Sequence, residues 1–120
     1  MIEKLYHTDV VLPAGFKAPQ QRVRVSYGPH ARKEAFEDRY GQIQLPNFIT
    51  LRRFRVIEVG MIGNRVSKIL FRGRLDDTRD LCIVLIPGVD KQPWRCKTVW
   101  VNVRTDKHRT LDTTRYEKVA

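Results

Sequence analysis

The chain has 120 residues, 42% of them hydrophobic, which suffices for one buried core and makes a single domain the expectation. Its 23 lysines and arginines outnumber 13 acidic residues, so the formal net charge is +10, and fifteen of the cations are arginines, whose planar fork suits phosphate. The longest apolar run has only six residues, and residues 1–6 carry Glu3 and Lys4 with no apolar segment after them, so we expect a cytoplasmic protein with neither a signal peptide nor a membrane partner.

The positive charge is unevenly distributed along the chain. Residues 1–20 are neutral, so the positive excess belongs to residues 21–120. We expect an arm or edge strand (1–20), a folded core (21–103) and a polar C-terminal tail (104–120).

Cys82 and Cys96 form no CxxC pair and fall in expected strands, where a buried reduced thiol is the ordinary interpretation. No two histidines or cysteines stand at ligand spacing, so neither a metal nor another cofactor is expected.

In the first third of the chain the spacing of the apolar residues changes once, from that of a strand to that of a helix. Residues 3–12 predict a weak strand or arm. Residues 22–27 alternate strictly, which predicts a strand with valines on a buried face and arginines on an exposed one. Residues 29–40 predict a helix, because Pro29 suits its first position and Gly41 suits its end. The inward side chains of that helix are expected to be Ala31, Ala35, Phe36 and Tyr40.

The remaining two thirds indicate strands. Residues 48–51 suggest a short helical turn. Residues 54–59 and 65–72 predict two strands, which Gly63-Asn64 joins in a hairpin. Asp76-Asp77 lies in a segment typical of a turn, and two adjacent carboxylates there seldom converge on one site.

The apolar run at residues 81–86 is rich in β-branched residues, which predicts the central strand of the sheet, covered on both faces. Residues 94–103 alternate again, with Trp94, Cys96, Thr98 and Trp100 expected on one side. Consecutive strands with short turns imply an antiparallel sheet, and one helix on its face makes the fold class α+β.

Short motifs border the expected helix: Ser26-Tyr27-Gly28-Pro29, His30-Ala31 and Arg39-Tyr40-Gly41. Others follow in the strands: Arg72, Asp76-Asp77 and Lys97-Thr98-Val99-Trp100. Together they resemble the RelE/ParE-like toxin superfamily, in particular an uncharacterised His-Ala-helix branch near the BrnT-type toxins. The resemblance covers about residues 22–103 and leaves out both ends of the chain. The polar tail is similar to tails carried by small bacteriophage proteins.

The resemblance implies a RelE-like fold, in which one main helix of the N-terminal half packs on a small antiparallel sheet of four to six strands. It also implies a metal-independent endoribonuclease that acts on RNA, and an acidic antitoxin as a further partner. Such chemistry needs a base, an acid and cations around the phosphate. The positions matching the motifs are His30 and Arg72, to which we add Lys97 as a phosphate ligand. His30 equally fits a packed histidine at a helix start.

The arginines predict a nucleic-acid surface independently of any catalysis. Pairs of arginines share strand faces, and a dense basic segment encloses Phe54, a pattern that suits single-stranded RNA. The residues expected to bind nucleic acid, RNA first, are Arg22, Arg24, Arg52, Arg53, Arg55, Arg74, His108 and Arg109. Solvated strand edges that only prevent aggregation are the structural alternative.

Other functions fit the same charge. A non-enzymatic phage or accessory protein could bind nucleic acid, or an acidic host protein, and would need no histidine. A structural virion component is a third candidate and would form defined oligomers. The salt dependence of binding distinguishes a nucleic-acid partner from a protein partner. Log affinity for nucleic acid falls steeply with log salt, whereas a flat slope indicates a protein partner.

Overall fold

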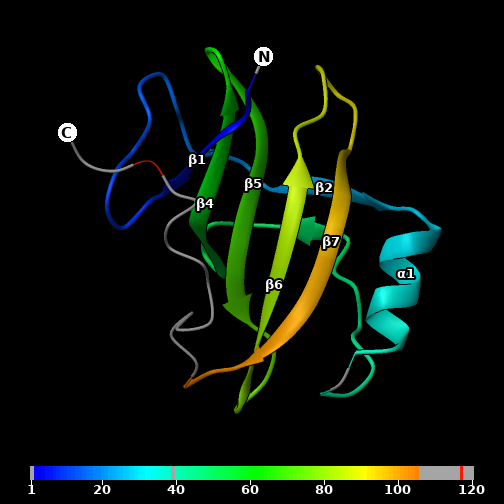
Figure 1. Cartoon of the computed structure of the whole chain (residues 1–120). Coiled ribbons are helices and arrows are strands. Elements are labelled where there is room, and N and C mark those ends of the chain that lie inside the picture. Colours follow the sequence, from blue (N-terminus) through cyan, green and yellow to red (C-terminus); the bar gives the residue numbers. More distant parts are fainter. Residues whose placement is uncertain (1, 39, 106–116, 118–120) are drawn as a thin grey trace.

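The structure is a computed structural model of the chain that describes residues 2–38, 40–105 and 117. The elements are β1 (Lys4–His7), β2 (Val23–Tyr27), α1 (Pro29–Phe36), β3 (Phe48–Ile49), β4 (Phe54–Ile62), β5 (Arg65–Arg74), β6 (Arg79–Ile86) and β7 (Trp94–Val103). Across the described residues seven strands form one sheet in the order β1-β4-β5-β6-β7-β2-β3, with α1 beside β7 (Figure 1). Within these same residues no helix is long and apolar enough to cross a membrane.

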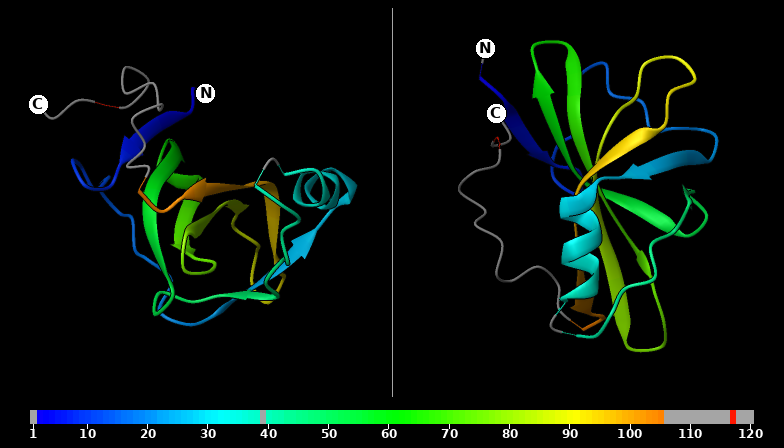
Figure 2. Two further views of the ribbon diagram at one scale, coloured as in Figure 1. Left: turned by 90° about the horizontal axis from the view of Figure 1, so that it is seen from below. Right: turned by 90° about the vertical axis from the view of Figure 1, so that its right-hand side faces the viewer.

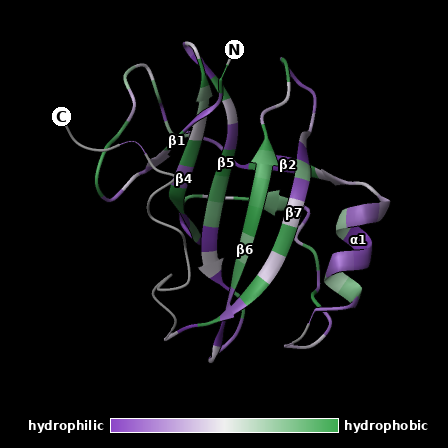
Figure 3. Cartoon of the chain, in the orientation of Figure 1, coloured by the Kyte–Doolittle hydropathy of each residue, from purple (hydrophilic) through white to green (hydrophobic). Residues whose placement is uncertain are grey.

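Strand β6 is the centre of the sheet, as the apolar run predicted. It pairs antiparallel with β5 on one side and with β7 on the other. Leu81, Cys82, Ile83 and Leu85 have no exposed surface, and Figure 3 shows the strand as almost uniformly hydrophobic. The Gly63-Asn64 hairpin between β4 and β5 is also confirmed, with Gly63 at the positive φ of 61° that its turn requires.

The sheet curls around the main core (Figure 2). Phe54, Phe71, Ile83 and Val99 point to the inside of this curl, together with the buried side chains of β2 and α1. A smaller cluster lies on the outer face and consists of Ile57, Leu70, Cys82 and Val84 with Trp100 packed against it. Both faces of the central strands are therefore buried, which explains their continuous apolar sequence.

The predicted fold class, a main helix on a small antiparallel sheet of four to six strands, is wrong. The protein is mostly β, with a seven-stranded sheet that is mixed because β2 runs parallel to β7. Helix α1 ends at Phe36 instead of residue 40 and buries only Ala31 and Ala35, while Phe36 is 68% exposed. Two alanines bury too little apolar surface to hold a helix across a sheet face. The helical turn expected at residues 48–51 is likewise replaced in part by β3.

Helix α1 instead extends the sheet edge that β2 begins. β2 pairs only with the first residues of β7, and α1 lies along the strand beyond that pairing. The Thr98 hydroxyl donates a hydrogen bond of 2.8 Å to Glu34, and the Val101 amide donates one of 3.1 Å to the Asp38 carboxylate. These contacts satisfy backbone and side-chain groups that an open strand edge would leave to solvent.

A bulge in β7 breaks the alternation predicted for residues 94–103. Thr98 pairs with Val84 and Cys96 with Leu85, so Lys97 is an extra residue between them. As a result Cys96 faces the main core together with Val99, and the two tryptophans separate. Trp94 packs against the main core, whereas Trp100 packs against the outer cluster, so the expectation that they share one face is wrong.

Candidate functional site

Arginines gather at the end of the sheet where β4 begins and β5 ends. A pocket of about 670 Å³ opens there, and six of the described arginines line it. We call it the arginine pocket; these arginines are Arg52, Arg53, Arg55, Arg72, Arg74 and Arg104. The same described wall contains two aspartates, Asp9 and Asp80, so with His7 neutral the formal charge of the lining is +4. Such a concentration of guanidinium groups attracts anions.

Strand register explains why the arginines meet. Arg55 on β4 stands directly opposite Arg72 on β5, and Arg74 follows two residues later on the same face. Like charges directly opposite each other on neighbouring strands destabilise a sheet, so this arrangement costs the fold stability. A bound anion would remove that repulsion. Gly73 lies between the two β5 arginines, and a Cβ at this position would come within 2.5 Å of the Phe54 ring.

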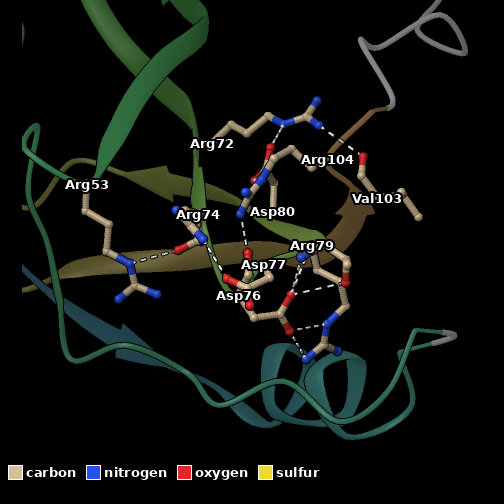
Figure 4. Close-up of polar contacts among 10 residues, drawn as sticks. Arg53, Arg72, Arg74, Asp76, Asp77, Arg79, Asp80, Val103 and Arg104 are labelled. Carbon is tan, nitrogen blue, oxygen red and sulfur yellow. Dashed lines mark hydrogen bonds and ion pairs between the residues drawn. The ribbon is translucent and has the colours of Figure 1, made fainter.

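Asp80 organises the buried part of the pocket (Figure 4). Its carboxylate accepts a hydrogen bond of 2.9 Å from Arg72 Nε and one of 3.4 Å from Arg104 Nε. The Arg72 side chain is only 6% exposed and also donates to the Val103 carbonyl at 3.4 Å. A buried guanidinium needs such partners, so Asp80 is a structural counter-ion that holds two cations at the wall of the pocket.

The other arginines are exposed and weakly engaged. Arg74 meets Asp77 at 2.7 Å and Arg55 meets Asp9 at 3.7 Å, both in pairs more than half exposed. Arg53 donates to the Arg74 carbonyl at 3.0 Å and lies over the Phe54 ring. Within the described part of the chain Arg52 has no hydrogen bond or ion pair. Exposed ion pairs contribute at most about 1 kcal/mol, so a ligand phosphate can replace them.

A turn at Asp76-Asp77 joins β5 to β6, as the sequence predicted. Asp76 accepts hydrogen bonds from the backbone amides of Thr78 (3.0 Å) and Arg79 (2.8 Å) and from the Arg79 guanidinium (2.6 Å). The hydrogen bond from the Arg79 side chain is the main cause that lowers the pKa of Asp76 to about 2. Arg104 donates to the Asp76 carbonyl, so the turn also helps to hold a pocket arginine.

The structure brings together Arg52, Arg53, Arg55, Arg72 and Arg74 among the predicted site residues, but not His30 or Lys97. The His30 side chain is 77% exposed on α1 and lies 3.3 Å from Glu34. Lys97 is exposed at the bulge of β7. Neither residue lines the arginine pocket. His108 and Arg109 lie outside the described residues.

Arg22 and Arg24 occupy a different place. They line a second pocket of about 530 Å³ with Lys91 and Trp94, beside the connection between β6 and β7. Strand β6 runs from Asp80, in the arginine pocket, to the connection with β7 (Figure 1). The two basic pockets therefore lie at opposite ends of this strand. Arg22 is stacked 4.3 Å above the ring centre of Phe48.

No family model, curated protein or solved structure matches this chain. The resemblance to the RelE/ParE-like toxins therefore stays a prediction. Among the described residues, no group of three His, Cys, Asp or Glu side chains could hold a metal ion. Cys82 and Cys96 are buried, as expected, and burial together with nearby Glu34 raises the pKa of the Cys96 thiol to about 12.

Three charged residues of the pocket were missed by the sequence analysis: Arg104, Asp80 and Asp9. A signal existed for two of them. Because β6 and β7 were both expected and are antiparallel neighbours, the start of one must meet the end of the other, which places Asp80 near Arg104. Asp9 had no such signal, because its position depends on the chain that follows β1.

Proposed function

We propose that the protein binds nucleic acid, with RNA as the first candidate, through phosphate groups held in the arginine pocket. The observation that carries the proposal is the excess of six arginines over two aspartates around one pocket. Guanidinium groups bind phosphate oxygens in the same forked geometry that they use for carboxylates. A cytoplasmic location, where RNA is abundant, belongs to this proposal.

Backbone contacts fit the arginine pocket better than base reading does. Phe54, the aromatic residue inside the basic segment, is only 2% exposed and cannot stack on a base. The exposed arginines that line the pocket are Arg52, Arg53, Arg55 and Arg74. Contacts of this kind supply affinity and salt dependence without reading a sequence.

Cleavage of RNA has less support than binding. The three residues expected to cleave, His30, Arg72 and Lys97, do not line one described pocket. General acid–base catalysis requires its groups within hydrogen-bond reach of one substrate. We therefore propose binding as the function, and cleavage stays a prediction that incubation of the protein with single-stranded RNA in EDTA will test. RNA that stays intact contradicts cleavage and leaves binding standing.

Fluorescence anisotropy with a labelled single-stranded RNA tests the proposal. We expect saturable binding that Arg74→Gln weakens several-fold, because Arg74 is exposed and its pair with Asp77 is solvated. Arg95→Gln is the matched control, since Arg95 is an exposed strand arginine that does not line the pocket.

Competition with polyglutamate distinguishes binding to nucleic acid from binding to an acidic protein. We expect a nucleic-acid site to keep its RNA when polyglutamate of equal total charge is added, because binding releases the counterions condensed along the RNA phosphate backbone. Equal competition by polyglutamate would contradict the proposal and favour an acidic protein partner. Equal loss of affinity in both arginine variants would contradict the arginine pocket as the binding site.

A further inference from the structure

A third pocket, of about 500 Å³, adjoins the arginine pocket, and its lining is mainly apolar. We call it the apolar pocket; the described residues that form it are Thr8, Asp9, Leu12, Phe16, Ala18, Leu51, Phe54, Arg55 and Val56. Four of these described residues also line the arginine pocket, namely Asp9, Leu51, Phe54 and Arg55. The two pockets therefore share a wall and lie side by side.

The floor of the apolar pocket is fixed by the core. Phe16 and Val56 are partly buried and pack against the main core, and Phe54, which is 2% exposed, lines both pockets. The Thr8 hydroxyl donates a hydrogen bond of 2.7 Å to the Val56 carbonyl, so its proton is already used. A ligand in this pocket would meet carbon atoms on most sides.

The rim of the apolar pocket is open and hydrophobic. Leu12 is 65% exposed and Leu51 is 43% exposed, although both line a concavity and could pack against a ligand. Covering such side chains with a flat apolar surface is favourable by about 25 cal/mol for each Å² removed from water. The only charged groups at this rim, among the described residues, are Asp9 and Arg55, which face the arginine pocket as well.

An apolar pocket beside a cationic one fits a ligand that carries a flat hydrophobic group beside an anion. A nucleotide has this form, since its base has two apolar faces and its phosphate lies one sugar away. We propose that the apolar pocket takes an unstacked base of the same strand whose phosphates lie in the arginine pocket. This rests on the proposed function, and it makes the ligand a single strand.

The proposal distinguishes single strands from duplexes on physical grounds. In a duplex the faces of each base are stacked on their neighbours, and extruding one costs a few kcal/mol. In a single strand the bases turn outward at little cost, and contact with a hydrophobic surface strengthens binding without a sequence preference. The apolar lining offers few groups that could distinguish one base from another.

Abasic oligonucleotides test the proposal directly. The probes are a labelled uridylate strand of about twelve nucleotides, the same strand with abasic riboses in its central half, and an RNA duplex of equal length. We expect the intact strand to bind about tenfold more tightly than the abasic strand or the duplex, while the intact and abasic strands share one salt slope.

The outcomes separate this proposal from the function on which it rests. Equal affinities for the intact and abasic strands overturn the proposal that a base enters the apolar pocket, yet leave phosphate binding standing. Binding of neither strand overturns the proposed function itself. Tighter binding of the duplex than of the intact strand also overturns the proposal.

Substitution of Leu12 assigns the base to this pocket. Leu12→Gln should bring the ratio of intact to abasic affinity close to one and leave the affinity for the abasic strand unchanged. Val89→Gln is the matched control, because Val89 is a 73% exposed apolar residue that does not line the apolar pocket. A ratio that stays near ten in Leu12→Gln contradicts the assignment.

Discussion

The salt dependence of binding will show whether the charge acts from the arginine pocket. The double variant R52Q/R55Q removes two exposed guanidinium groups and leaves the buried pairs of Asp80 intact. Arg52 has no hydrogen bond or ion pair in the described part of the chain, and the pair of Arg55 with Asp9 is more than half exposed. The free energy of unfolding should therefore change by about 0.5 kcal/mol or less.

The magnitude follows from the formal charge of the pocket. If its net charge of +4 neutralises about four phosphates, log affinity for a single strand falls with log salt at a slope of about −2.8. Raising salt from about 50 to about 200 mM then weakens binding by the wild-type protein about 50-fold. The double variant retains about two of these charges, so its slope should be about −1.4 and its loss about 7-fold.

Anisotropy titrations at four or more salt concentrations give these slopes. The matched control is R65Q/R95Q, which has the same net charge as R52Q/R55Q but changes exposed arginines that do not line the pocket. We expect the slope of the control to stay near the wild-type value. If both variants reduce the slope equally, the charge acts from the whole surface, and the reasoning from the arginine pocket is wrong.

Three further predictions concern the groups around the site and the core. Asp80→Asn removes the carboxylate that Arg72 Nε contacts at 2.9 Å in a buried pair, so urea denaturation should show a loss of about 3 kcal/mol in unfolding free energy, and an unchanged midpoint would refute the structural role of Asp80. The pKa of Asp76 in the folded protein, about 2, lies below its ordinary 3.8, so its stabilisation is complete above pH 3.8 and is lost as the pH falls through 2. Asp76→Asn should therefore flatten the decline of stability between about pH 4 and pH 2, and acid titrations that coincide with wild type would contradict this assignment. Because the pKa of the Cys96 thiol is raised to about 12 and the side chain is buried, the thiol should resist iodoacetamide at pH 8 until urea unfolds the protein, and rapid labelling of the folded protein would refute this.

Local patterns predicted the central hairpins because each of their signals lies within a few residues. The apolar run of β6 and the Gly63-Asn64 turn depend only on neighbours in the sequence, and both are confirmed. The bulge at Lys97 could not be predicted this way, since an extra residue becomes visible only when β7 is aligned with β6. The parallel pairing of β2 with β7 was also missed, because it joins segments far apart in the chain.

The part of the candidate site that depends on strand alternation and on a recognised hairpin could also be predicted from the sequence. Arg72 and Arg74 share a face by strand alternation, and Arg55 joins them through a hairpin whose turn was recognised. His30 was chosen from a motif at a helix start, which carries no information about the pocket it would face. The apolar pocket had no sequence signal, because the connection after β1 forms one of its walls and has no periodic pattern.

The parallel pair of β2 and β7 restricts the order in which the chain can assemble during synthesis. β2 emerges early, but its partner residues Trp94–Cys96 emerge late, so closing this long loop must wait for most of the chain. β4, β5 and β6 are joined by short turns and can form first, and they carry half of the residues that line the arginine pocket. A nascent chain would thus expose its cationic surface while Val25 still lacks its partner strand β7, which gives a chaperone both a charged and an apolar segment to bind.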